Sequence, residues 1–188
     1  MQDILFFVPH RIAKDSKTSL YLDINHKYGY GDPYIDLSSC KITTGLCRNT
    51  RPDSLQNRIY KLVQEGKKNI YVIYYSSNIK KGLISSIMKV NKSQVFMNAE
   101  AAYIKGHRYP NNTSYNEQAK KDYPKTLSHP YIVGRLEKGT LSRYRLTEKT
   151  KSHYRLTRKK GVTMYELQIG GSQRRGTIQK LLSLCEEI

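Results

Sequence analysis

The chain has 188 residues, of which 38% are hydrophobic, enough for one modest core and too few for two full domains. Its 33 Lys and Arg outnumber 15 Asp and Glu, so the formal charge is +18 at pH 7. Self-repulsion of this size opposes compaction, whereas neutralising phosphate groups releases counterions and favours association. We therefore expect a polyanionic partner. Nucleic acid, DNA before RNA, is expected ahead of membrane phosphates, an acidic protein or a merely solvated surface.

The cysteines and apolar runs indicate the cellular compartment of the protein. Cys40, Cys47 and Cys185 form neither a CxxC pair nor a Cys/His cluster with zinc spacing, and their number is odd. This argues against a disulfide framework and favours a reducing environment. The apolar stretch Ile4–Val8 is too short for a signal peptide or a membrane span, and no other apolar run approaches the length required. We expect a cytoplasmic protein with no membrane partner.

The N-terminal part predicts two short strands and a loop. Ile4–Val8 is typical of a buried strand, and Ser19–Ile24 alternates like a half-exposed one. The following stretch, Tyr28–Tyr34, combines glycines and a proline with tyrosines. It is predicted to be a loop whose rings are suited to recognition.

A helix and a hairpin are predicted next. Asp53 is a plausible N-cap with Gln56 three residues later, and Gly66 ends an amphipathic helix whose apolar face contains Leu55, Ile59, Leu62 and Val63. The β-prone runs Ile70–Tyr75 and Gly82–Val90 should then pair as a hairpin at the centre of the sheet.

The C-terminal half begins with a polar insertion at residues 105–128, which we interpret as a long surface excursion. Tyr131–Leu136 and Met164–Ile169 are predicted as two further strands. A C-terminal helix is predicted from the apolar stripe of Ile178, Leu181, Leu182 and Cys185.

A short internal repeat predicts a basic hairpin within residues 141–188. The hexamer Tyr144–Lys149 recurs with one change as Tyr154–Lys159. At strand spacing one side of each arm is basic and the other can pack. The phosphate contacts expected there are Arg145, Arg155, Arg158 and Lys159; a solvated hairpin is the alternative.

The turn Gly170–Gly176 is a second candidate for anion binding. It contains Arg174 and Arg175 between a predicted strand and the last helix. Two arginines at a helix start oppose the helix dipole by about 0.3–1 kcal/mol each unless an anion lies between them. We expect both to contact phosphate, with a flexible solvated turn as the alternative.

Standard enzyme signatures are missing. The sequence has no GxxxxGK[ST], HExxH or GxSxG motif, and its five histidines lack a regular ligand spacing. No catalytic residue is assigned, and no metal or cofactor is expected.

The segment Tyr34–Val90 resembles the PUA-like domains, in particular the nucleotide-modification-associated branch related to EVE and ASCH domains. The resemblance rests on Leu37–Lys41 leading to Cys47 and Arg48, followed by the two strands of the predicted hairpin. It implies a small β-barrel with flanking helices and a pocket for a modified or flipped base. The implied base-binding residues are Tyr30, Asp32, Ser39, Lys41, Tyr74 and Tyr75, although Tyr74 and Tyr75 should point to opposite faces, leaving one of them in the core.

Together these observations predict one α+β domain over residues 1–188, a small β-barrel or strongly curved mixed sheet with flanking helices. The first functional hypothesis is a nucleic-acid-binding module with a basic backbone-binding surface and a tyrosine-lined base pocket. The alternatives are a metal-independent nuclease or base-excising glycosylase of a phage or restriction system, and a protein that covers an acidic partner surface.

Overall fold

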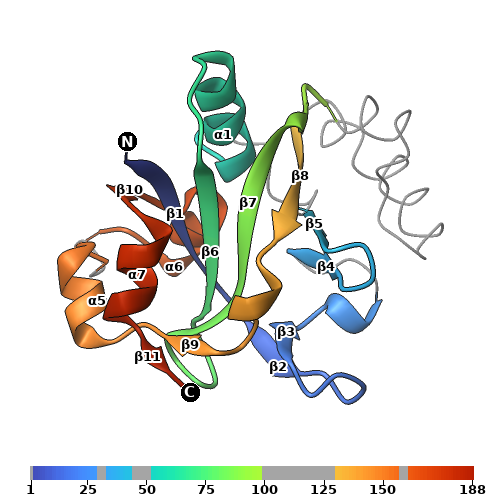
Figure 1. The fold of residues 1–188 in the computed structure, drawn as a ribbon, viewed down its shortest axis with the longest axis vertical. Helices are drawn as coiled ribbons and strands as arrows, with labels where there is room; N and C mark the ends of the chain where they lie inside the picture. Colours follow the sequence, from blue (N-terminus) through green and yellow to red (C-terminus); the bar gives the residue numbers. More distant parts are fainter. Residues whose placement is uncertain (1, 29–32, 44–51, 99–129, 157–160) are drawn as a thin grey trace.

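The computed structural model describes residues 2–28, 33–43, 52–98, 130–156 and 161–188 (Figure 1). They form a mixed sheet with helices on both faces. The strands are β1 (Asp3–His10), β2 (Ile12–Lys14), β3 (Tyr21–Asp23), β4 (Tyr34–Asp36), β5 (Lys41–Thr43), β6 (Ile70–Ser76), β7 (Leu83–Phe96), β8 (Tyr131–Leu136), β9 (Tyr144–Arg145), β10 (Ser172–Gly176) and β11 (Glu186–Glu187). The α-helices are α1 (Leu55–Gln64), α5 (Glu148–His153), α6 (Met164–Gly170) and α7 (Ile178–Leu184), and short 3-10 turns lie at His26–Tyr28 and Lys138–Thr140. No helix in these described ranges is long and apolar enough to cross a membrane.

The sheet has the strand order β10-β1-β6-β7-β8-β5-β4, with β9 beside β7 and β11, while β2 and β3 form a separate pair. β1 and β6 are parallel, and their neighbours along the path are antiparallel. A parallel pair needs a long crossover, which here contains β2 to β5 and α1. The predicted α+β class and mixed sheet are therefore confirmed. Over the described residues the path from β10 to β4 does not close, so the predicted barrel is not found.

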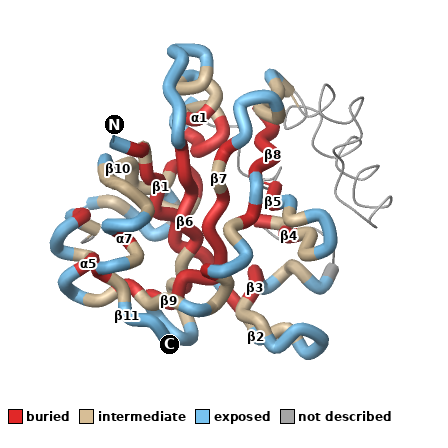
Figure 2. Tube along the Cα trace, in the orientation of Figure 1, coloured by how far each residue is buried: buried red, intermediate tan, exposed pale blue. Residues whose placement is uncertain are grey.

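The sheet is buried on both faces because its central strands are apolar almost throughout (Figure 2). Along β1, Phe6 and Val8 face one core and Leu5 and Phe7 face the other. The first core is completed by α1, β3, β4 and β5, and the second by α7 and the segment after α5. A strand enclosed in this way forms a continuous apolar run, which explains why β1 and β6 were predictable from the sequence.

The predicted central hairpin and first helix are confirmed with small changes. β6 and β7 pair in antiparallel fashion and occupy the middle of the sheet. The α1 N-cap is Ser54 rather than Asp53, because the Ser54 hydroxyl accepts a hydrogen bond from the backbone N–H of Asn57. Arg58 of α1 donates to the carbonyl oxygens of Gly170 and Gly171 at 2.6 and 3.1 Å, which ties the helix to the end of α6.

Two predictions for the C-terminal part are wrong. Met164–Ile169 is not a strand but lies in α6, which begins with a capping box between Thr163 and Glu166. The spacing of these two residues is itself a helix-start signal and outweighs the β propensity of the segment. The turn Gly170–Gly176 is largely strand β10, which pairs with β1.

The predicted basic hairpin is also wrong, although the C-terminal helix is confirmed as α7. The first copy of the repeat contains β9 and then starts α5, where Thr147 and Thr150 form a capping box and both donate to the Leu184 carbonyl. In the second copy Tyr154 is buried and Arg155 has a left-handed φ of 49°. The same local sequence thus adopts different structures because its two copies meet different neighbours. The predicted insertion at 105–128 lies outside the described residues.

Candidate functional site

A row of cations crosses one face of the sheet. Lys89 of β7 pairs directly with Arg135 of β8, and Arg135 pairs with Lys41 of β5. Directly paired residues project to the same face, and adjacent strands lie about 4.8 Å apart. On one side the row continues to Tyr71 of β6, and on the other it ends at Asp36 of the edge strand β4. We call Lys41, Lys89 and Arg135 the cationic row. Like charges directly opposite each other destabilise a sheet, so the arrangement favours an anion above it.

The cationic row borders a surface cleft of about 420 Å³. The cleft is lined by Lys68, Asn69, Lys89, Val90, Asn91, Lys92 and Arg135. It forms where β7 leaves β8: Val90 pairs with Gly134 and Val95 with Ile132, so residues 91–94 lie opposite Val133 alone. Asn91 stabilises this bulge, because its Oδ1 accepts hydrogen bonds from the backbone N–H and hydroxyl of Ser93 at 3.2 and 2.8 Å. A β-bulge therefore creates a concave surface rich in positive charge.

Three cations of the cleft each contact a neighbouring group. Arg135, with 64% of its side chain exposed, donates to Glu137 at 2.9 Å, and this hydrogen bond raises the pKa of the guanidinium. The Lys89 ammonium lies 5.6 Å from the centroid of the Tyr71 ring, a cation–π contact. Lys92 Nζ donates to the Gly66 carbonyl at 3.4 Å. These contacts restrict the positions of the three charged groups.

Of the residues implied by the PUA-like resemblance, Lys41 belongs to the cationic row and Ser39 belongs to the turn before it. Asp36 accepts hydrogen bonds from the hydroxyls of Ser38 and Ser39 at 2.6 Å each, and these bonds lower the pKa of the Asp36 carboxyl to about 2. The turn leads into β5 and positions Lys41. Ser39 therefore has a structural hydrogen bond, and its contact with a base stays a prediction.

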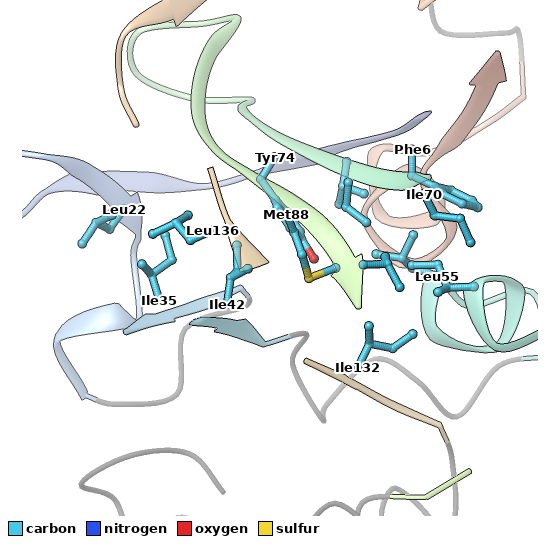
Figure 3. Close-up of a cluster of buried hydrophobic side chains, with 14 residues drawn as sticks. Phe6, Leu22, Ile35, Ile42, Leu55, Ile70, Tyr74, Met88, Ile132 and Leu136 are labelled. Atoms are coloured by element: carbon cyan, nitrogen blue, oxygen red, sulfur yellow. The ribbon is translucent and has the colours of Figure 1, made fainter. Parts of the chain in front are cut away.

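Tyr74 and Tyr75 of β6 lie on opposite faces of the sheet. Tyr74 is 1% exposed and packs near Met88 and Ile42 in the first core (Figure 3). Tyr75 points to the other face, is half-buried, and has its pKa raised to about 12 by desolvation. The expectation that one of the pair is core is confirmed for Tyr74, and neither ring lines the cleft. Tyr30 and Asp32 lie outside the described residues.

The predicted arginine contacts are dispersed. Arg174 donates to the carbonyl oxygens of Tyr154, Gln173 and Arg155, so it is engaged in holding the end of α5. Arg175 is exposed and, as the next residue of β10, points to the opposite side, so the two do not converge on one phosphate. Nη1 of Arg145 lies 3.4 Å from Oε2 of Glu186, and Arg155 is exposed. Arg158 and Lys159 lie outside the described residues.

A buried polar network lies elsewhere in the fold. His10 Nε2 is 2.6 Å from the Ser85 hydroxyl, and His10 Nδ1 is 3.4 Å from Asp23 Oδ2. Ser85 reaches His10 because the β6–β7 register shifts between Tyr74 and Tyr75, which pair with Ser86 and Ile84 and leave Ser85 as the extra residue. The types and order of contacts resemble a nucleophilic triad, but Ser85 is 0% and His10 2% exposed. The network therefore joins β1, β3 and β7, and among the described residues its side chains are buried.

The sequence reasoning predicted Lys41 of the cationic row and missed every residue that lines the cleft. The available signal was a lone cation in an apolar strand: Lys89 follows Met88 in the hairpin, and Arg135 precedes Leu136. Neither is notable alone, and only the strand register brings them together. Within the described ranges no three His, Cys, Asp or Glu side chains cluster as metal ligands, and Cys40 and Cys185 are free thiols.

Comparison with known protein families, with curated proteins and with solved structures yields no match for this chain.

Proposed function

We propose that this chain binds nucleic acid through its phosphate backbone, with the cationic row and the adjoining cleft as the contact surface. The observation that carries the proposal is the direct pairing of Lys89 with Arg135 and of Arg135 with Lys41 on three adjacent strands. Cross-strand pairs contribute about 0.2–1 kcal/mol to the stability of a sheet, and a pair of like charges is unfavourable. A phosphate group bound between the two cations would make the interaction favourable.

The charge balance around the cleft supports the same function. The cleft and the row together contain Lys41, Lys68, Lys89, Lys92 and Arg135. Of the neighbouring carboxylates, Glu137 offsets part of the Arg135 charge, and Asp36 is engaged by the hydroxyls of its turn, so the other four cations keep the site positive. A polyanion can contact several of these cations at once and release its counterions, which suits a chain of formal charge +18.

The experiment compares binding of labelled oligonucleotides by fluorescence anisotropy at increasing salt. The double variant Lys89→Gln/Arg135→Gln keeps long polar side chains and removes two charges. It should weaken binding to every sequence and reduce the slope of log affinity against log salt by about 1.4–1.8, the value for two phosphate contacts. The control is Lys14→Gln, an exposed cation of β2, which lies at the other end of the molecule from α1 and the start of β6 (Figure 1).

Equal salt slopes for the wild type and the double variant, with the fold intact by circular dichroism, would refute this function. An incision assay on the same oligonucleotides, with and without added metal, tests the alternative of a nuclease or glycosylase. Strand cleavage or base release by the wild type would favour the enzyme over the binding module.

A further inference from the structure

Asn69 occupies an unusual position in the wall of the cleft. It has a left-handed φ of 55°, which asparagine tolerates better than most residues but which glycine adopts without strain. The backbone holds it there, because the Asn69 carbonyl accepts a hydrogen bond from the N–H of Ile4 at 3.0 Å. Lys68 precedes it and the buried strand β6 follows, so the residue joins the charged rim of the cleft to the core.

The side chain of Asn69 is exposed, and within the described residues its amide makes no hydrogen bond. Other asparagines are engaged: Asn78 bonds both the N–H and the carbonyl of Ile12, and Asn91 bonds Ser93. Asn69 therefore offers a planar donor and acceptor among cations. This pair of groups matches the edge of a nucleobase, whereas a phosphate requires donors alone.

The cleft has a larger volume than a phosphate group would fill. Its volume of about 420 Å³ lies within the range of about 300–1,000 Å³ that is typical of small-ligand sites. Lys89, Lys92 and Arg135 supply positive charge, and Asn69 lines the same cleft. A phosphate and the base attached to it can thus be accommodated together.

We infer that the cleft holds one unpaired nucleotide, with its phosphate on Lys89 and Arg135 and its base edge on the amide of Asn69. This inference rests on the proposed nucleic-acid binding and narrows the ligand to single-stranded nucleic acid. In a duplex the bases are stacked and their pairing edges are occupied, so a base from an unpaired strand enters the cleft without the cost of unstacking and unpairing that flipping out of a duplex requires. The cations hold the backbone of any sequence, and Asn69 makes the affinity depend on a base being present.

The test measures binding of three ligands by fluorescence anisotropy: a single strand of mixed sequence, the same strand with abasic sites throughout, and the corresponding duplex. The wild type should bind the base-bearing strand about five- to tenfold more tightly than the abasic strand, the effect expected of one good base contact. Asn69→Gly removes the amide and suits the left-handed backbone. It should bring this ratio close to one and leave the affinity for the abasic strand unchanged.

Ser19→Gly is the matched control, because Ser19 is also exposed and has a φ of 59° in the turn between β2 and β3. It should retain the wild-type ratio. If Asn69→Gly also retains it, or if the wild type does not discriminate against the abasic strand, the inference is wrong. The backbone proposal is judged separately, since it fails if the folded Lys89→Gln/Arg135→Gln variant keeps the salt slopes of the wild type.

Discussion

Hydrogen bonds made by His10 and Asn78 help attach the β2–β3 pair to the main sheet. His10 bridges Asp23 of β3 and Ser85 of β7, and Asn78 holds the backbone of Ile12 in β2. A buried polar group that loses its partner keeps its desolvation penalty and no longer gains the compensating bond. The two adjacent serines of β7 allow this cost to be measured, because Ser85 is bonded to His10 while the Ser86 hydroxyl has no partner within the described residues.

We predict that Ser85→Ala lowers the free energy of unfolding by about 1–3 kcal/mol, since it leaves the buried His10 Nε2 unpaired. Ser86→Ala, at an equally buried site, should be close to neutral because it removes a hydroxyl without breaking a bond. Urea denaturation followed by circular dichroism gives both values. Similar losses for the two variants would mean that the His10 contact contributes nothing specific.

At the scale of elements, the site depends on how closely β7 and β8 approach each other. Gly134 of β8 pairs with Val90 at the edge of the bulge, and a Cβ atom there would lie 2.3 Å from Cγ of Met88 and 2.8 Å from the Lys89 carbonyl oxygen. These distances leave no room for a methyl group without displacing one strand. Since Lys89 and Arg135 flank this contact, the same displacement would separate the two cations.

We predict that Gly134→Ala destabilises the fold by about 1–3 kcal/mol through overpacking and also weakens oligonucleotide binding. Gly139→Ala is the control, because nothing lies within 4 Å of a Cβ at Gly139. Thermal unfolding and anisotropy titrations measure the two effects. A Gly134→Ala variant with wild-type stability and affinity would show that the β7–β8 spacing is adjustable and is not a constraint on the site.

At the scale of the whole molecule, the charge of +18 acts on stability and on binding in opposite directions. Salt screens the self-repulsion of the folded chain, and the Debye length falls from about 30 Å at 0.01 M to about 10 Å at 0.1 M. The same salt reduces the gain from counterion release when a polyanion binds.

We predict that the Tm of the free protein rises between about 0.01 and 0.1 M salt, whereas the extra stabilisation by a single-stranded oligonucleotide shrinks over the same range. Differential scanning fluorimetry with and without the oligonucleotide measures both trends. A Tm increment from the oligonucleotide that does not change with salt would contradict electrostatic binding.

The sequence by itself determined the strands and helices whose burial requires a recognisable pattern of apolar residues. The apolar runs of β1, β6 and β8 and the amphipathic stripes of α1 and α7 are visible without a structure, because strands buried on both faces and helices packed on one side restrict composition directly. The net charge is likewise visible from composition alone, and the polyanionic partner that it predicts stays a prediction. The start of α6 was also present in the sequence as the Thr163–Glu166 capping box. It was not predicted, because the residues that follow have a high β propensity.

Only the tertiary structure decided which charged residues form a site. Lys41, Lys89 and Arg135 are far apart in the sequence and become neighbours through the register of β5, β7 and β8. The same register turned Arg174 and Arg175 to opposite sides of β10, and the packing of β6 placed Tyr74 in the core. Strand register and the position of a bulge are set by the fit of many side chains across neighbouring strands, and no local pattern encodes that fit.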